Sequence, residues 1–186
     1  MKQYEIEIKL FVKNLKQLIQ DLKTLGFQKE VLKREEDVYF YSRHYDIKKR
    51  DEALRIRKST NLMTNQIKTQ LNFKGPKLDK ISMSRKELEI EIENAFIMEE
   101  ILQNLDFGKA ASVCKTRQYM RRNDITACID QVENLGNFLE LEILAESKDQ
   151  KEKSLKRIEE ILENLGYSME DTTQTSYLSM LMNQEK

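Results

Sequence analysis

Charged and apolar side chains alternate along several short segments of this 186-residue chain. In the first segment, Glu5-Ile6-Glu7-Ile8-Lys9-Leu10, two carboxylates and an ammonium share one face of a strand, and three apolar side chains share the other. The alternation returns in segments that begin near Lys33, Leu54, Gln66, Arg85, Lys115, Thr126 and Asn137. An apolar row has to be buried, so the pattern predicts a sheet with one covered face and one charged face.

Other segments carry apolar residues at helical spacing, which predicts amphipathic helices. The first runs from Leu15 to Leu25, between an Asn14 cap and a terminating Gly26. The second covers 95–105 after an Asn94 cap, the third covers 150–165, and a short last helix is expected within 171–182. In the second helix we expect an apolar stripe to face the sheet, formed by Ile97, Ile101, Leu102 and Leu105.

These elements favour one fold class. Three amphipathic helices can cover the outside of a curved sheet, which leaves the charged strand faces turned toward one another. A closed antiparallel β-barrel of about eight strands meets both demands and leaves no sheet edge. We therefore predict an α+β fold with helices packed outside a tunnel, in a single domain over 1–186. Gly75-Pro76 is expected to end the strand that begins at Gln66.

A weak internal echo supports this organisation. Glu5-Ile-Glu-Ile and Glu87-Leu-Glu-Ile are each followed by a helix, a Leu-x-Phe and further strands. The echo predicts two halves related by a pseudo-twofold axis.

Composition excludes several classes of function. The 32 basic and 32 acidic side chains balance, which disfavours nucleic acid as a partner. No apolar run approaches the ~20 residues of a membrane span, and no signal peptide is evident, so we expect a cytoplasmic protein without membrane association. Cys114 and Cys128 form no CxxC pair and are expected to be free thiols. The only histidine, His44, gives no basis for His-based catalysis, and a homodimer is left open.

The charges themselves point to a chemistry. Carboxylates are hard oxygen ligands for Mg²⁺ or Mn²⁺, and lysine and arginine bind phosphate oxygens. Isolated buried ions cost several kcal/mol each, so a lumen lined by both signs has to be wet or filled by charged ligands. A sheet with one solvated face would show a similar pattern, and that alternative stays open at this point.

The ordered motifs of the chain resemble those of the CYTH superfamily, the triphosphate tunnel metalloenzymes. Glu5-Ile-Glu-Ile-Lys9 matches its ExExK signature, and further matching segments follow in the family's order: Asp37–Phe40, Leu54–Arg57, Phe73–Pro76, Ser84–Glu87, Lys115–Arg117, Ile129–Asp130 and Gly136–Glu142. The chain is most similar to the class IV adenylyl cyclase branch, which shares the Phe-Lys-Gly-Pro and Gly-x-Phe-x-Glu-x-Glu segments, and thiamine triphosphatases are related.

The resemblance implies a tunnel that binds a triphosphate together with Mg²⁺ or Mn²⁺. The implied metal ligands are Glu5, Glu7, Glu140 and Glu142, with Asp130 and Glu87 as further candidates. The implied phosphate-binding residues are Lys9, Arg55, Arg57, Lys74, Arg85, Lys115 and Arg117. Tyr39 and Lys74 are candidates for positioning or deprotonating an attacking water, although Tyr39 could equally be a packed strand aromatic. Glu89 is expected to orient the cations.

Three functions share this site. A class IV-type adenylyl cyclase would convert ATP to cyclic AMP and pyrophosphate. A triphosphatase would hydrolyse inorganic triphosphate, thiamine triphosphate or a nucleotide. A non-catalytic module would only bind polyphosphate or nucleotide. The cyclase is preferred because the motif residues match those of the class IV branch. The binding module is disfavoured because pure anion binding calls for an all-basic lumen.

Overall fold

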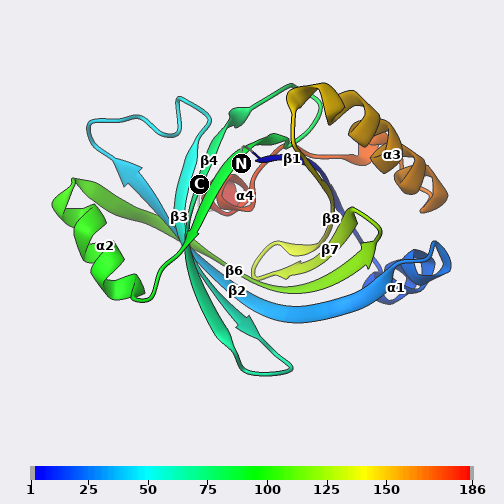
Figure 1. The fold of residues 1–186 in the computed structure, drawn as a ribbon, viewed down its shortest axis with the longest axis horizontal. Helices are drawn as coiled ribbons and strands as arrows, with labels where there is room; N and C mark the ends of the chain where they lie inside the picture. The colour runs from blue at the N-terminus through cyan, green and yellow to red at the C-terminus, as the bar shows by residue number, and fades with distance from the viewer. Residues whose placement is uncertain (1–2, 185–186) are drawn as a thin grey trace.

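The computed structural model describes residues 3–184, in which eight antiparallel strands close into a barrel (Figure 1). Around the barrel the strands follow the order β1-β5-β4-β3-β2-β6-β7-β8. Their bounds are β1 Gln3–Phe11, β2 Gln28–Ser42, β3 Ala53–Asn61, β4 Ile67–Lys77, β5 Arg85–Glu91, β6 Phe107–Arg122, β7 Ile125–Val132 and β8 Gly136–Ala145. The predicted α+β fold with a closed antiparallel barrel is confirmed.

Four α-helices accompany the strands within the described residues: α1 Leu15–Thr24, α2 Ala95–Asn104, α3 Lys151–Asn164 and α4 Tyr177–Gln184. Short 3₁₀ turns lie at Lys148–Gln150 and Met169–Asp171. The Asn14 side chain accepts a hydrogen bond from the Gln17 amide at 3.1 Å, and Gly26 follows α1 with φ of +88°, as the predicted cap and stop require. No helix among residues 3–184 is both long and apolar enough to cross a membrane.

The predicted pseudo-twofold is present in the strand order. Exchanging β1 with β5, β2 with β6, β3 with β7 and β4 with β8 maps the barrel order onto itself. Four pairs join the two halves, β1–β5, β4–β5, β2–β6 and β1–β8, and each half contributes one long strand, β2 or β6. Helix α1 in the first half therefore corresponds to α2 in the second.

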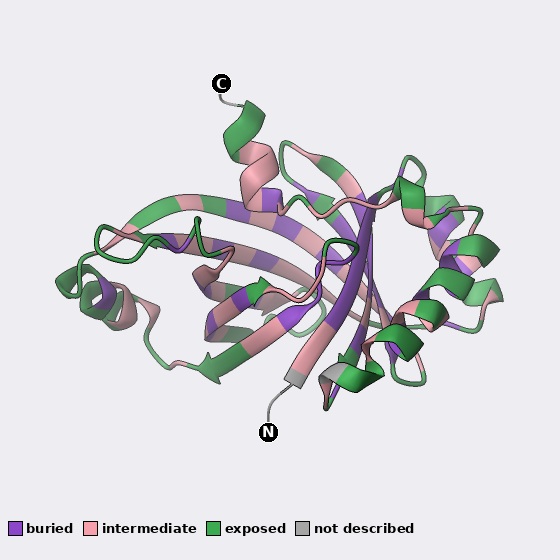
Figure 2. Ribbon diagram, turned by 90° about the horizontal axis from the view of Figure 1, so that it is seen from above, coloured by how far each residue is buried: buried purple, intermediate pink, exposed green. Residues whose placement is uncertain are grey.

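The largest apolar core lies outside the barrel, between its wall and two helices. The outward side chains of β1, such as Ile6 and Ile8, are at most 1% exposed, and they pack with Leu22 of α1 and Ile158 of α3. Figure 1 shows α1 and α3 on one side of the barrel and α2 on the other, and Figure 2 shows the same separation from above. Apolar residues thus turn outward to the helices, and charged residues line the lumen.

Two local predictions were wrong. Strand β4 does not end at Gly75-Pro76 but continues to Lys77, because a register shift against β5 between Lys74 and Lys77 accommodates a proline that cannot donate a ladder hydrogen bond. In α2, only Leu102 of the predicted inward stripe is buried. Ile97, Ile101 and Leu105 are 52%, 47% and 63% exposed, because no other described element covers that side of the helix.

The position of the core predicts which apolar residues hold the barrel together. Leu22→Ala should lower the free energy of unfolding by about 2–5 kcal/mol, because it opens a cavity between α1 and the barrel wall, where Leu22 is 0% exposed. Lys16→Ala, on the exposed face of the same helix, should change it by less than about 0.5 kcal/mol. Urea unfolding followed by circular dichroism measures both. Equal effects would contradict this packing.

Candidate functional site

The barrel lumen holds a cavity of about 580 Å³, a size typical of small-molecule sites. Residues from all eight strands except β7 line it, together with the loop after β2 and the start of α4. Helix α4 lies within the outline of the barrel in Figure 1 and forms part of the cavity wall through Tyr177 and Leu178. Charged side chains of both signs face this space.

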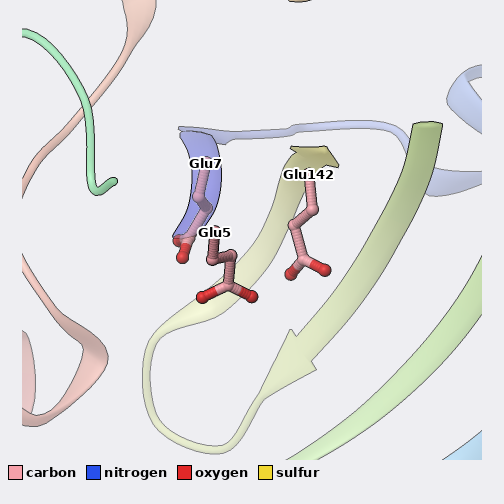
Figure 3. Close-up of side chains that lie close together, drawn as sticks. All are labelled: Glu5, Glu7 and Glu142. Carbon is pink, nitrogen blue, oxygen red and sulfur yellow. The ribbon is translucent and has the colours of Figure 1, made fainter. Parts of the chain in front are cut away.

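An acidic cluster stands on one wall of the cavity. Glu5 and Glu7 project from β1 and Glu142 from β8, and each offers a carboxylate oxygen such that the three oxygens lie within 4.8 Å of one another (Figure 3). The register brings them together, because Glu7 of β1 is paired directly with Glu142 of β8. Three converging carboxylates are a hard oxygen donor set of the kind that Mg²⁺ and Mn²⁺ prefer.

The protonation behaviour of the cluster fits a cation. Burial, followed by the charge of Glu140, raises the pKa of Glu7 to about 7. Burial and the charge of Glu5 also raise the pKa of Glu142 well above its ordinary value. Both shifts express the cost of gathering negative charge in a shielded place, and a divalent cation would remove that cost. The residues present therefore fit a divalent metal.

Lys74 stands beside this cluster. Its ammonium lies 3.0 Å from Glu5 Oε2 and also contacts Glu87. Burial raises the pKa of Glu5, but the charge of Lys74 outweighs it and brings that pKa down to about 2. For Lys74, burial lowers the pKa, but Glu5 and Glu87 outweigh it and raise the net value, so the side chain stays protonated at neutral pH. That state favours a positioning role or proton donation over the role of a base.

Arginines on β3 are held by acids on β2. Asp37 accepts hydrogen bonds from Arg57 Nε at 2.6 Å and Nη2 at 2.7 Å, and from Arg55 Nη1 at 3.2 Å. Glu35, which is 1% exposed, lies 3.2 Å from Arg57 and accepts a hydrogen bond from Tyr119 at 2.7 Å. Bidentate pairing fixes the plane of the Arg57 guanidinium, so its remaining N–H groups are oriented before a ligand binds.

The second half of the barrel repeats this device with the charges exchanged between strands. Arg117 of β6 donates from Nε and Nη2 to the two oxygens of Asp130 of β7, each at 2.6 Å. Arg117 also contacts Glu140 and lies 3.3 Å from Glu142, both on β8. Asp130 further accepts hydrogen bonds from Lys115 at 3.2 Å and from Tyr177 at 2.9 Å. Its carboxylate is thus occupied by cations and a hydroxyl.

Lys9 and Lys115 face the lumen under the ring of Tyr177. The Lys9 ammonium lies 4.4 Å from the ring centroid and 3.9 Å from Glu140, and the Lys115 ammonium lies 5.2 Å from the same ring. Burial lowers the pKa of Lys9 despite the charges of Glu140 and Glu7. An ammonium that is 2% exposed and only loosely paired gains most from an added anion.

Three of the predicted site residues make contacts other than those expected from the sequence. Arg85 donates to the carbonyl oxygens of Gly75 at 3.2 Å and Asp51 at 3.3 Å, so part of its guanidinium holds the loops at the cavity edge. Tyr39 accepts a hydrogen bond from Arg55 at 3.2 Å and lines the cavity. Glu89 accepts hydrogen bonds from the amides of Gln70 and Asn72, and so does not directly orient the cations.

The structure thus brings most of the predicted residues to one cavity. Of the predicted metal ligands, Glu5, Glu7 and Glu142 form the acidic cluster, Glu87 and Glu140 border it through Lys74 and Arg117, and Asp130 lies behind Arg117. Sequence reasoning missed the supporting acids Glu35 and Asp37, and also Tyr119 and Tyr177. The inward orientation of Glu35 and Asp37 could have been predicted, because both alternate in phase with Tyr39. The role of Tyr177 depends on where α4 packs, which no local sequence pattern indicates.

Comparison with known proteins agrees with this geometry. The family model described as the CYTH domain matches residues 3–177. The chain belongs to the CYTH family. A protein of Methanocaldococcus jannaschii that carries the provisional name adenylate cyclase MJ0240 is 38% identical over 176 residues, which cover 95% of this chain and 97% of that protein.

Solved structures share the CYTH fold of this chain. The PH1819 protein of Pyrococcus horikoshii superposes with a TM-score of 0.88 at 31% identity, over 97% of this chain and 99% of that protein. HpAC1 of Hippeastrum, provisionally named an adenylyl cyclase and described as having a dominant triphosphatase activity, has a TM-score of 0.64 at 16% identity, over 99% and 96% of the two chains. The latter likeness is one of fold.

The raised pKa values predict a pH dependence of metal binding. Below pH 7, Glu7 holds a proton that Mn²⁺ has to displace, since the pKa of this group is about 7. The Glu7 proton alone should therefore make Mn²⁺ affinity rise with pH by up to about tenfold per unit below the pKa and level off above it. Calorimetric titrations in buffers of different ionisation enthalpy measure the affinity and count the released protons. An affinity independent of pH, without proton release, would contradict this reading of the cluster.

Proposed function

We propose that this CYTH protein is a divalent-metal-dependent enzyme that acts on a triphosphate, with conversion of ATP to cyclic AMP and pyrophosphate as the reaction that fits best. The observation that carries the proposal is the lumen itself, where an acidic cluster and a set of arginines and lysines face one cavity. We place the whole chain in one triphosphate tunnel domain and in the reducing cytosol, which suits its two free thiols.

The presence of charges of both signs in the lumen supports a metal–triphosphate ligand. The acidic cluster lies where β1 meets β8, and the paired arginines lie on β3 and β6. A pure cation binder would need no arginines, and a pure anion binder would be weakened by the cluster. A triphosphate with its divalent ion matches both, because the ion satisfies the carboxylates while the phosphate oxygens satisfy the cations.

The residues of the chain then divide the work of the reaction. When bound at Glu5, Glu7 and Glu142, the metal would supply Lewis acidity and lower the pKa of an attacking hydroxyl. The proposed phosphate-binding residues are Lys9, Arg55, Arg57, Arg85, Lys115 and Arg117. Lys74, kept protonated by Glu5 and Glu87, positions a phosphate oxygen or stabilises the leaving pyrophosphate. Asp37 and Asp130 hold the arginines in place, so little reorganisation remains for the reacting complex.

The lining of the cavity favours a nucleotide over inorganic triphosphate. Apolar and aromatic side chains stand beside the charges: Tyr39, Tyr41, Ile47, Met83, Leu178 and Met182. Inorganic triphosphate has no apolar surface to bury there, whereas a nucleobase does. Hydrolysis remains the second candidate, because the same fold in the Hippeastrum protein is associated with a dominant triphosphatase activity.

Removing one carboxylate tests the proposed metal cluster. Glu142→Gln keeps the shape of the side chain but removes its charge, and it should lower Mn²⁺ affinity by at least about tenfold and turnover by about 100-fold or more. Glu133→Gln is the control, because Glu133 is exposed and pairs with Arg34 at 2.9 Å. Calorimetry and a product assay give the two readouts. Normal metal affinity in a folded Glu142→Gln protein would remove this residue from the site.

The cation side of the cavity is tested at Lys9. Lys9→Met keeps the aliphatic stem and removes the ammonium, so inorganic triphosphate should bind about 10–100-fold more weakly in the presence of Mn²⁺. Lys13→Met provides the control, because Lys13 is an exposed lysine just outside β1. Competition against a fluorescent ATP analogue measures the affinities. Unchanged binding by Lys9→Met would show that this ammonium does not face the ligand.

The reaction is identified by its products. The purified chain is incubated with ATP, inorganic triphosphate or thiamine triphosphate, each with Mg²⁺ or Mn²⁺, and the products are separated by chromatography. Cyclic AMP and pyrophosphate from ATP are expected. Orthophosphate as the main product would replace the cyclase by a triphosphatase, and tight metal-free binding without turnover would replace both by a binding module.

A further inference from the structure

A gap in the pairing of β1 lies beside the acidic cluster. Strand β1 pairs with β8 along Tyr4–Phe11, but β5 pairs with it no further than Glu5. Backbone groups of successive residues in a strand point to opposite sides, so Glu7 is the next residue whose amide and carbonyl face the β5 side. Glu7 also contributes its carboxylate to the acidic cluster. The backbone of this proposed metal ligand therefore needs another partner on that side.

The loop between β4 and β5, residues 78–84, supplies that partner. The Glu7 amide donates a hydrogen bond to Ser84 Oγ at 3.2 Å, and the Glu7 carbonyl accepts one from the Met83 amide at 3.0 Å. Ser84 is 0% exposed, so no water can replace its hydroxyl easily as the acceptor for the Glu7 amide. A loop serine thus takes the place of a strand partner at this point of the barrel.

The Ser84 hydroxyl is itself oriented by a chain of hydrogen bonds. Ser84 Oγ lies 2.7 Å from Ser82 Oγ, which lies 2.8 Å from Asp79 Oδ2. A carboxylate can only accept, so Ser82 gives its single hydroxyl proton to Asp79, and Ser84 is left as the donor to Ser82. The lone pairs of Ser84 then remain for the Glu7 amide. Lys151, the first residue of α3, lies 3.2 Å from Asp79 and anchors the chain of hydrogen bonds outside the barrel.

Charge repulsion within the acidic cluster makes this hold on β1 consequential. Carboxylate oxygens of Glu5, Glu7 and Glu142 lie within 4.8 Å of one another. Like charges at that separation repel, and a movement of β1 on the side that lacks a strand partner would relieve the repulsion. The hydrogen bond between Ser84 and the Glu7 amide opposes that movement before any ion is bound.

We propose that Ser84 is a positioning residue for metal binding, which holds Glu7 within the acidic cluster through the Glu7 amide. Ser84 is not among the residues that line the cavity, so it acts through Glu7 and not by touching a ligand. Asp79 and Ser82 keep its hydroxyl in the orientation that the Glu7 amide requires. The inference rests on the proposed metal-dependent function and adds to it a requirement that lies outside the lumen.

Calorimetry with Mn²⁺ tests this role on the intact chain. Ser84→Ala removes the acceptor with little change in volume, and it should lower Mn²⁺ affinity by about tenfold. Ser82→Ala leaves the Ser84 hydroxyl in place without its own acceptor, and it should lower the affinity by a smaller factor. Ser154→Ala is the matched control, because it removes a buried hydroxyl from α3 outside the barrel, and it should keep the affinity within about twofold.

Hydrogen exchange in the metal-free protein separates positioning from a general loosening of β1. In Ser84→Ala, the Glu7 amide should exchange at least about tenfold faster by NMR, whereas the Ile8 amide, on the β8 side of the strand, should change by less than about threefold. Equal acceleration of both amides would overturn the proposal, because Ser84 would then support the strand as a whole.

The metal titration distinguishes failure of this inference from failure of the proposed function. Circular dichroism establishes that each variant is folded. Wild-type binding of Mn²⁺ with unchanged affinity in folded Ser84→Ala would overturn the role of Ser84 alone. A wild type that binds no Mn²⁺ would overturn the proposed function, and this inference with it.

Discussion

The burial of paired charges inside a closed barrel is the constraint on which the rest of the structure depends. Asp37 with Arg57, and Asp130 with Arg117, are bidentate pairs on neighbouring strands, and their carboxylates are at most 2% exposed. Such pairs are costly to bury and add little net stability, whereas breaking one costs about 3–5 kcal/mol. The free energy that stabilises the fold therefore comes from the apolar shell outside the barrel. The lumen can then be shaped for ligand binding.

The internal pseudo-twofold relates two strand pairs of the barrel that carry different charges. The acidic cluster of β1 and β8 and the Lys74–Glu87 contact of β4 and β5 lie at corresponding strand pairs. The counterpart of Glu142 on β4 is Asn72, which pairs with Glu89. The next inward residue, Lys74, pairs with Glu87 and neutralises that side of the lumen, so the net negative charge lies beside β8. The internal repeat thus builds a polar lumen with an acidic cluster beside β8 and a lysine at the corresponding strand pair. The two halves also differ outside the barrel, where Leu88 and Ile90 of β5 are exposed while Ile6 and Ile8 of β1 are buried.

Most of the barrel could be predicted because strand alternation is local information. The alternation within one hexapeptide is enough to place Glu5, Glu7 and Lys9 on the same face of β1. The pairing of β1 with β8 then brings Glu142 opposite Glu7. Contacts set by tertiary docking could not be predicted in this way. Tyr177 reaches Asp130 across 47 positions of sequence, and the exposure of Ile97 depends on which elements pack beside α2. The predicted end of β4 at Pro76 was wrong because the strand continues through a register shift that the residue pattern does not indicate.

The central claim is that a divalent ion and a triphosphate share this lumen, each on its own side. The most direct measurement is the crystal structure of the protein with Mn²⁺ and a non-hydrolysable ATP analogue, with data collected at the manganese absorption edge. The account predicts an anomalous peak among the carboxylates of Glu5, Glu7 and Glu142, and phosphate oxygens in contact with Lys9, Arg57 and Arg117. A manganese peak away from the acidic cluster, or an analogue bound outside the lumen, would contradict it.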